Sequence, residues 1–388
     1  MGPKHIRDPI HGYITVEDAV LGVLDTPAVQ RLRHVRQLGT ASLVYPGANH
    51  TRFEHALGAF SLGARAASQL SLAAEEALDL RLALLLHDVG HGPFSHLCEP
   101  AMRRALGVGH KDLSLKLVQG ELRPSIEAAG ASPARIAELI DGRGPLGPLV
   151  SGDLDLDRMD YLVRDAHYTG VEVGVDLDRL LGALTLHGGQ PALRDDALHA
   201  AEVLLVTRFL MYSTVYYHRA ARIAERMVDR AMQVAMDEGY FTAAAMVRMD
   251  DGELLHRLRA APGVPSALAA MLDGRALLKC ATEATAEQAG KQAEALRRDR
   301  DRAAFEQELA AQAGCDPRLV IVDLPDMPVV REVRALVVDP EGKAQPLSAR
   351  SSLVASLPKA QLDHWRLRVF GPSEARGALA RATRARLG

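Results

Sequence analysis

Ionisable side chains that could do chemistry are concentrated at residues 80–96, which read LRLALLLHDVGHGPFSH. Residues 82–86 form an apolar run that is too short for a membrane span, which needs about 18 such residues, so the run predicts a helix buried on most sides. His87 and Asp88 end that run. Because a buried imidazole and carboxylate are costly unless satisfied, and because both are good metal ligands, the pair indicates a site for a divalent cation.

The loop after this helix adds two more imidazoles, His91 and His96. Gly90, Gly92 and Pro93 break the helix and place both histidines on one turn. An adjacent His-Asp pair could also be a hydrogen-bonded pair without a metal, and by itself it fits both interpretations equally. The glycines, the proline and the additional histidines favour the metal site.

The residues that would complete such a site lie on two other predicted helices. Arg52 and His55 are three residues apart at the start of a helix that runs towards Leu70, so they share a helix face. His55 alone would more often be structural, but one helix hairpin before His87 it becomes a candidate third ligand. An acidic helix start follows within residues 151–170, where the macrodipole favours carboxylates. Acidic caps are common, so none of these aspartates is diagnostic, although one on the buried face would need a partner such as a shared cation.

Composition limits the class of protein. The chain has 388 residues, of which 48% are hydrophobic and 24% charged, and a net charge of −3, which is ordinary for a globular protein. No overall basic excess points to nucleic acid, although local patches leave that partner open. Three cysteines without a CxxC pair argue against a disulfide framework or a zinc knuckle, and the N-terminus lacks the apolar core of a signal peptide. We therefore expect a cytoplasmic protein with no membrane partner.

The order of the elements predicts a mainly α fold with a smaller C-terminal α/β part. A short extended segment is expected within residues 6–15. Helices are expected from 25 or 26 to about 38, and at 52–70, 80–87, 94–106, 110–121, 154–165 and 197–238, with more through about 312. Strands are expected at 319–322, 333–338 and 365–370, before a last helix at 373–386. The predicted division is a core at 1–240, a helical extension at 241–312 and a C-terminal α/β subdomain at 313–388.

Taken in order, these motifs resemble the HD-domain metal phosphohydrolases. Arg52-Phe53-Glu54-His55, His87-Asp88 and Asp157 follow the H…HD…D pattern of that family. The blocks that are similar to its dNTP triphosphohydrolase branch are 8–14, 26–39, 45–58, 87–96 and 154–165. That branch includes the SAM-and-HD-domain enzyme of animals and bacterial dGTPase-like proteins, and the resemblance implies an HD-domain helical core.

The resemblance implies a role for each matched position. For a site holding one divalent ion (Fe, Mn, Zn, Ni, Co or Mg), the implied ligands are His55, His87, Asp88 and Asp157. The implied catalytic histidines around the α-phosphate are His91, His96 and His110. The positions that match substrate contacts are Arg52 and Arg158 for phosphate, Gln37, Leu38, Tyr161 and Asp165 for the sugar, and His218 for the base. The positions that match an activating guanine-nucleotide site of the animal enzyme are Asp25, Gln30 and Arg33.

The resemblance also implies a substrate and an assembly. We expect hydrolysis of deoxynucleoside triphosphates to deoxynucleoside and triphosphate, by a homodimer or homotetramer, with Mg accompanying the substrate triphosphate as a further expectation. Asp157, Tyr161 and Asp165 are spaced by four residues, so they share a helix face. A ring packed against the 2′ carbon would leave no room for a ribose hydroxyl, so we expect Tyr161 to favour dNTPs over NTPs.

The sequence leaves alternatives open for base selectivity, for the activator site and for the function. Thr214 and Arg222 stand where the animal enzyme has a phosphate-binding Arg and a base-side Tyr, which leaves base selectivity open. Asp25 could be only a helix cap and Arg33 only a surface charge. An HD phosphohydrolase acting on nucleoside monophosphates or signalling nucleotides is the second functional hypothesis. A non-catalytic nucleotide- or nucleic-acid-binding protein is the third, and the complete metal and histidine set argues against it.

Overall fold

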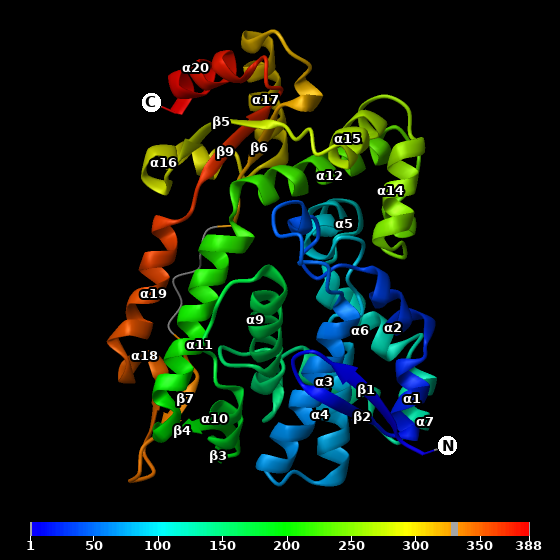
Figure 1. Cartoon of the computed structure of the whole chain (residues 1–388), viewed down its shortest axis with the longest axis vertical. Coiled ribbons are helices and arrows are strands. Elements are labelled where there is room, and N and C mark those ends of the chain that lie inside the picture. The colour runs from blue at the N-terminus through cyan, green and yellow to red at the C-terminus, as the bar shows by residue number, and fades with distance from the viewer. Residues whose placement is uncertain (1, 327–332, 388) are drawn as a thin grey trace. The chain divides into compact units, whose positions relative to one another are not determined.

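The computed structural model describes residues 2–326 and 333–387, and its fold is mainly helical, as predicted (Figure 1). Contacts divide these residues into two compact units. The first consists of residues 2–211, 243–252 and 333–355, and the second of residues 212–242, 253–326 and 356–387. The predicted boundaries at 240 and 312 followed composition rather than contacts, and they stay predictions.

A helical hairpin of α3 (Arg52–Gln69) and α4 (Ala74–Leu86) forms the centre of the first unit, and α9 (Leu156–Thr169) packs on α3. Thr51 starts α3 through a capping box, because its side chain accepts a hydrogen bond from the Glu54 backbone while the Glu54 carboxylate accepts one from the Thr51 backbone at 2.7 Å. The apolar run that predicted a buried helix does end α4, where all its residues are buried. These three helices therefore begin or end next to the candidate ligands.

The first unit contains further helices. They are α1 (Asp18–Leu24), α2 (Pro27–Arg31), α5 (Glu99–Leu106), α6 (His110–Gln119), α7 (Arg123–Ala128), α8 (Pro133–Ile140), α10 (Leu177–Gly182), α11 (Leu198–Met211), α13 (Ala243–Met246) and α18 (Leu347–Arg350). Two helices begin with residues of the first unit and end with residues of the second. They are α14 (Asp251–Ala260) and α19 (Ser352–Asp363).

Two helix predictions were wrong in extent. The helix expected to reach residue 38 ends as α2 at Arg31, followed by a 3₁₀ turn, because Val35 is extended and Arg36 forms an isolated β-bridge with Thr51. The nearly continuous helix expected at 197–238 is interrupted by a π-helical turn at Tyr212–Tyr216 before the next helix begins.

Two sheets belong to the first unit. β1 (Lys4–Asp8) and β2 (Gly12–Val16) form the hairpin expected near the N-terminus, and Gly12 takes the positive φ of 73° that the turn needs. The other sheet has the order β3-β4-β7-β8, with strands Leu184–His187, Gln190–Arg194, Leu336–Val338 and Ala344–Pro346. β7 pairs in parallel with β4, so the expected strand at 333–338 joins strands that the sequence did not predict.

The second unit packs helices on a three-stranded antiparallel sheet. Its order is β5-β9-β6, with strands Lys279–Ala284, Leu367–Gly371 and Ile321–Asp323. The helices are α12 (Arg219–Asp237), α15 (Val264–Asp273), α16 (Ala286–Ala295), α17 (Asp299–Ala313) and α20 (Arg376–Leu387). Phe305, Trp365 and Leu379 are among the buried residues of its core. The expectation of helix throughout residues 241–312 was wrong at β5, because its partner strand lies over 80 residues later in the chain.

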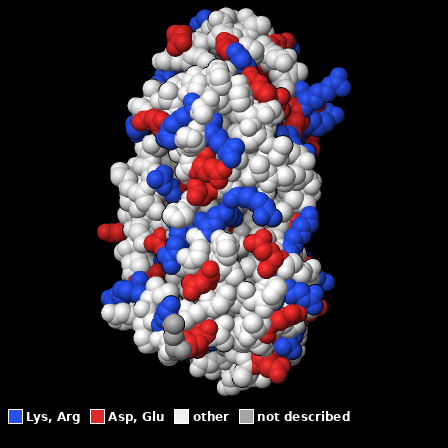
Figure 2. All heavy atoms as spheres, turned by 90° about the vertical axis from the view of Figure 1, so that its right-hand side faces the viewer, with Lys and Arg blue, Asp and Glu red and all other residues white. Residues whose placement is uncertain are grey.

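Two surface properties bear on the expected partners. Among the described residues, no helix is both long and apolar enough to cross a bilayer. On the face shown in Figure 2, basic and acidic side chains are interspersed, which agrees with the net charge of −3.

Candidate metal and histidine site

Four side chains from three helix ends converge in the first unit. His55 lies in the first turn of α3, His87 caps the C-terminus of α4 with Asp88 next to it, and Asp157 lies in the first turn of α9. The Nε2 atoms of His55 and His87 are 3.3 Å apart. Oδ2 of Asp88 lies 3.6 and 3.5 Å from these two nitrogens, and Oδ1 of Asp157 lies 3.1 and 3.5 Å from them.

The other ring nitrogens of this pair decide what the site can hold. Nδ1 of His87 is 2.8 Å from the carbonyl oxygen of Leu84, and Nδ1 of His55 is 2.8 Å from Oδ2 of Asp160. Because these oxygens only accept, each neutral imidazole carries its proton on Nδ1 and turns a bare Nε2 lone pair inward. These two lone pairs face the carboxylates of Asp88 and Asp157, and Arg52 donates to Asp88 only, so the acceptors outnumber the donors and a cation would satisfy them.

A divalent ion fits this donor set. Two ligands at about 2.1 Å from a tetrahedral ion lie roughly 3.4 Å apart, close to the observed separations. His55, His87 and Asp88 form the compact group, and Asp157 joins it through the two imidazoles. Mixed imidazole and carboxylate ligands suit several first-row metals, so the donor set does not select one.

The local potential favours positive charge in the same place. Burial opposes the charged form of His55, but hydrogen bonds to Asp157 and Asp160 outweigh it and raise the pKa of His55 to about 10. Burial also opposes the ionised form of Asp157, yet His87 and His55 hold the pKa of that carboxyl below its usual range. The pocket thus attracts a proton or a metal ion, whichever is available.

A buried network that the sequence did not predict orients His55. Asp160 is 0% exposed and accepts hydrogen bonds from His55, from Nε2 of His11 at 2.6 Å and from Nε of Arg164 at 2.9 Å. Arg164 also donates to Asp8 at 2.9 Å. A carboxylate behind a ligating imidazole fixes its tautomer and raises its basicity, so this network supports metal binding.

Space for that network comes from one glycine. A Cβ on Gly58 would stand 1.9 Å from Oδ1 of Asp160, so any larger residue on this turn of α3 would displace the carboxylate. The four-residue spacing of Asp160 and Arg164 was a visible signal of an ion pair on one helix. His11 and Asp8 gave no local signal, because their partners are about 150 residues away.

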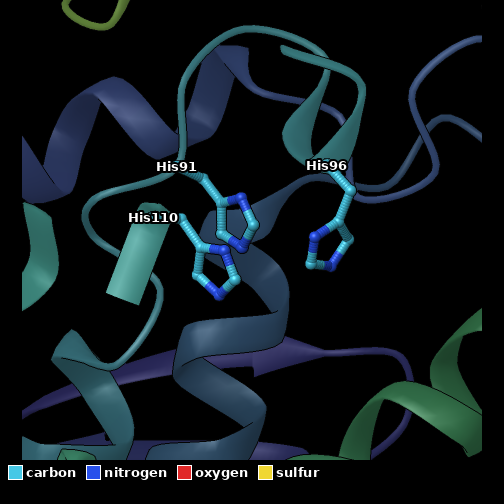
Figure 3. A group of neighbouring side chains, drawn as sticks. All are labelled: His91, His96 and His110. Carbon is cyan, nitrogen blue, oxygen red and sulfur yellow. The ribbon is translucent and has the colours of Figure 1, made fainter. Parts of the chain in front are cut away.

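A second cluster contains His91, His96 and His110 (Figure 3). The rings of His91 and His110 stack with centroids 4.0 Å apart and planes 10° apart, and His96 meets His91 edge-on at 4.7 Å. They come from the loop after α4, a 3₁₀ turn and the first residue of α6. Oε2 of Glu99 lies 3.1 Å from Nδ1 of both His96 and His110, so one carboxylate orients two rings.

Burial and neighbouring cations keep part of this cluster neutral. The pKa of His91 lies well below its usual range because the ring is buried and faces Arg52 and His110. The side chain of His96 is 66% exposed and its Nδ1 lies 3.1 Å from Glu99, so this ring can meet solvent or a substrate. Neutral imidazoles close together can accept or pass on a proton, as general acid–base catalysis requires.

Asp88 connects the two clusters. Its Oδ2 faces the His55–His87 pair, while its Oδ1 lies 3.3 Å from Nε2 of His91. The guanidinium of Arg52, which is 3% exposed, also pairs with Asp88 and donates through Nε to Ser95 Oγ at 2.8 Å. A group held at the metal position would therefore lie beside Arg52. Only the Asp88 carboxylate would separate it from the histidine cluster.

Two of the predicted sugar-side residues, Gln37 and Asp165, bond to a residue that the sequence did not single out, His50. Its Nε2 lies 2.8 Å from Oδ1 of Asp165, and its carbonyl accepts from the Gln37 backbone at 3.0 Å. Asp165 and Gln37 are both buried, and Oε1 of Gln37 has no hydrogen-bond partner within the described residues. The Tyr161 ring lies edge-on to that of His55 at 6.4 Å, so Tyr161 borders the metal cluster.

The remaining phosphate and sugar positions have simpler surroundings. Nη1 of Arg158 donates to the Asp153 carbonyl at 2.9 Å, and its side chain is 26% exposed. Leu38 is half-buried in the turn after Gln37.

Four predicted positions remain, namely His218, Arg33, Gln30 and Asp25. His218 belongs to the second unit, where it precedes α12 and where burial lowers its pKa. Arg33 stacks on the Phe53 ring at 3.6 Å and donates to Gln30 at 2.8 Å. Asp25 is exposed and ends α1, and Thr26 is the N-cap of α2, so the start of this helix at 25 or 26 is as expected.

Comparisons with known proteins identify the family of the chain. The HD domain model matches residues 52–165, and the model of the HD associated region matches residues 175–388. An uncharacterised protein of Methanocaldococcus jannaschii is 31% identical over 379 residues, which cover 96% of this chain and 80% of that protein.

Two further comparisons concern named activities. The deoxynucleoside triphosphate triphosphohydrolase SAMHD1 homolog of Dictyostelium discoideum is 30% identical over 253 residues, and the match covers 60% of this chain and 49% of that protein. The chain thus spans about half of that relative's length. The crystal structure of a phosphohydrolase from Bacteroides thetaiotaomicron superposes with a TM-score of 0.76 at 25% identity, covering 95% of this chain and 99% of that one. The chain therefore belongs to the HD superfamily of phosphohydrolases, as a member in which the HD associated region follows the HD domain.

Proposed function

We propose that the protein hydrolyses deoxynucleoside triphosphates to deoxynucleoside and triphosphate in a metal-dependent reaction. The observation that carries the proposal is the position of Asp88, whose two oxygens face the metal cluster and His91. One bound phosphate could then meet a metal ion, Arg52 and an imidazole at once. The names of the SAMHD1 relatives support a dNTP as the substrate.

The chemistry at the α-phosphate can be assigned to residues. A divalent ion held by His55, His87, Asp88 and Asp157 supplies Lewis-acid activation when bound. Arg52 offsets charge that develops on the phosphoryl oxygens. Water oxygen bonds to the α-phosphorus while the bond from phosphorus to the 5′ oxygen breaks. One histidine of the cluster accepts the proton that the water loses, and the cluster passes a proton on to that leaving oxygen.

The sugar-side group supports a deoxyribose. Asp165 and Gln37 are buried polar side chains held together through His50, and the open Oε1 of Gln37 could accept a hydrogen bond from a sugar hydroxyl. Tyr161 would lie between this group and the metal position. A Tyr161 ring packed against the 2′ carbon would favour a deoxyribose over a ribose, which is why we place the dNTP reaction first.

A nucleotide activator and a homo-oligomer belong to the same proposal. The contact of Arg33 with Gln30 and Phe53 leaves the Arg33 guanidinium exposed enough to meet an anion. The cytoplasmic location expected from the cysteines also remains part of the proposal.

Product analysis tests the reaction directly. The purified protein is incubated with each dNTP and with Mn²⁺ or Mg²⁺, and ion-exchange chromatography separates triphosphate, pyrophosphate and phosphate. Equimolar deoxynucleoside and triphosphate are expected. Pyrophosphate plus monophosphate, or release of the terminal phosphate, would contradict the proposal and favour another phosphohydrolase activity.

A further inference from the structure

The loop that carries His91 and His96 contains a strained turn. Phe94 and Ser95 have positive φ angles of 55° and 59°, in the left-handed region that side chains other than glycine rarely adopt. Both residues are buried, at 3% and 2% exposure. Two successive residues in this region persist only when their surroundings hold them there.

Asp251 holds this turn from a distant part of the chain. Its Oδ1 accepts the backbone N–H of Phe94 at 2.6 Å, and its Oδ2 accepts that of Arg36 at 3.0 Å. Ser95 Oγ donates to the Arg36 carbonyl at 2.5 Å, which closes a ring of bonds between the two segments. The segment 249–251 also contributes the Met249 carbonyl, which accepts from Arg31 at 2.9 Å, and Arg31 binds the His91 carbonyl as well.

The buried carboxylate of Asp251 bonds to other segments rather than to its own helix. Asp251 is 7% exposed and is the first residue of α14, yet its bonds to Phe94 and Arg36 reach segments far from that helix in the sequence. Burial raises its pKa to about 6 against the opposing backbone donors, which shows that keeping the charge there is costly. Its position, 86 residues beyond the HD match at 52–165, explains why no HD motif predicts it.

We infer that Asp251 is a positioning residue that fixes the histidine loop against the segment carrying Gln37. This inference rests on the proposed function, because His96 must face the leaving oxygen while Gln37 faces the sugar. A displacement of about 1 Å can cost roughly 100-fold in rate when reacting groups must be aligned. The carboxylate itself touches no substrate in this scheme.

The test compares Asp251→Ala and Asp251→Asn with the matched control Asp250→Asn, which removes the neighbouring charge. Hydrogen–deuterium exchange of peptides covering residues 35–38 and 89–96 is measured together with metal content and dNTP kinetics. For Asp251→Ala we expect faster exchange confined to these two peptides, unchanged metal content, and a kcat at least about tenfold lower with a smaller change in KM. Asp251→Asn keeps one acceptor, so its loss should be intermediate, and Asp250→Asn should match wild type.

The outcomes separate this inference from the proposed function. Unchanged exchange at 89–96 in both Asp251 variants overturns the inference whatever the enzyme hydrolyses. Exchange that rises throughout the first unit, or an equal loss in Asp250→Asn, also overturns it, because the role would then be general stability. If exchange rises at the two peptides while the wild type releases no triphosphate from any dNTP, the positioning role stands and the proposed reaction fails.

Discussion

At the residue scale, the sequence predicted the metal ligands that stand in short motifs. His55, His87 and Asp88 stand in recognisable local patterns, and the structure brings them within one compact group. Asp160 and His11 support His55, and His50 holds Asp165, through contacts that join segments more than 100 residues apart. A pattern read along the chain cannot reveal such pairings, because neither partner is near the other in sequence.

The metal site leads to the first prediction. Asp88→Asn and His87→Ala should lose bound metal and activity together, because each removes a donor from the group of lone pairs. Asp160→Asn should weaken metal binding about 10–100-fold, since it removes only the charge behind His55. Metal per chain is measured by mass spectrometry after dialysis against EDTA. His199→Ala, which changes an exposed ring, is the control, and full metal content in His87→Ala would refute the assignment.

Sugar selectivity gives the second prediction. Tyr161→Ala should raise activity on GTP relative to dGTP, because it removes the ring that would occupy the space of a 2′ hydroxyl. It should slow dGTP hydrolysis less than it relaxes this preference. Steady-state kcat/KM on both nucleotides, for wild type and variant, decides the matter. Equal values on dGTP and GTP in the wild type would argue against a sugar gate at Tyr161.

At the element scale, prediction succeeded where a helix has strong local signals. The start of α3 and the apolar run of α4 were both predicted from the sequence. The helix expected to reach residue 38 ends early, because Arg36 takes part in the bridge to Thr51 and in the bond to Asp251. β5 was missed for the same kind of reason, since its pairing with β9 is remote in sequence. Tertiary contacts thus override local propensity at these places.

The third prediction concerns the hydrogen bond that Asp251, the first residue of α14, accepts from the histidine loop. Burial raises the pKa of Asp251 to about 6, above the ordinary 3.8, while Phe94, the Arg36 charge and the Asp250 charge also act on it. A carboxyl with a raised folded-state pKa stabilises the fold fully below the unfolded pKa and loses that contribution as pH rises through about 6. From about pH 4 to pH 6, wild type should therefore lose roughly 1–3 kcal/mol of unfolding free energy relative to Asp251→Asn. Urea titrations at several pH values measure this, and parallel curves would contradict it.

At the scale of the whole molecule, neither unit is continuous in sequence, although each sheet lies within one unit. Residues 333–355 add two strands to the sheet of the first unit, while β6 and β9 complete the sheet of the second. The sequence predicted strands after residue 312. It could not predict that some of them belong to the first unit and others to the second. Long-range pairing of this kind is decided by the whole fold rather than by composition.

The fourth prediction concerns assembly, which is expected from the resemblance. Val203 and Leu210 are seven residues apart on α11, so they share a helix face, and they are 38% and 41% exposed. A second copy of the chain could bury that apolar face, and light scattering should then report a dimer or tetramer. Val203→Asp with Leu210→Asp should lower the mass, because charges would be buried in the contact. Tyr13→Asp, at a side chain 68% exposed on β2, adds the same charge elsewhere and should leave the mass unchanged. A monomeric wild type, with and without dGTP, would refute the assembly, and an oligomer unaffected by the α11 double variant would place the contact on another surface.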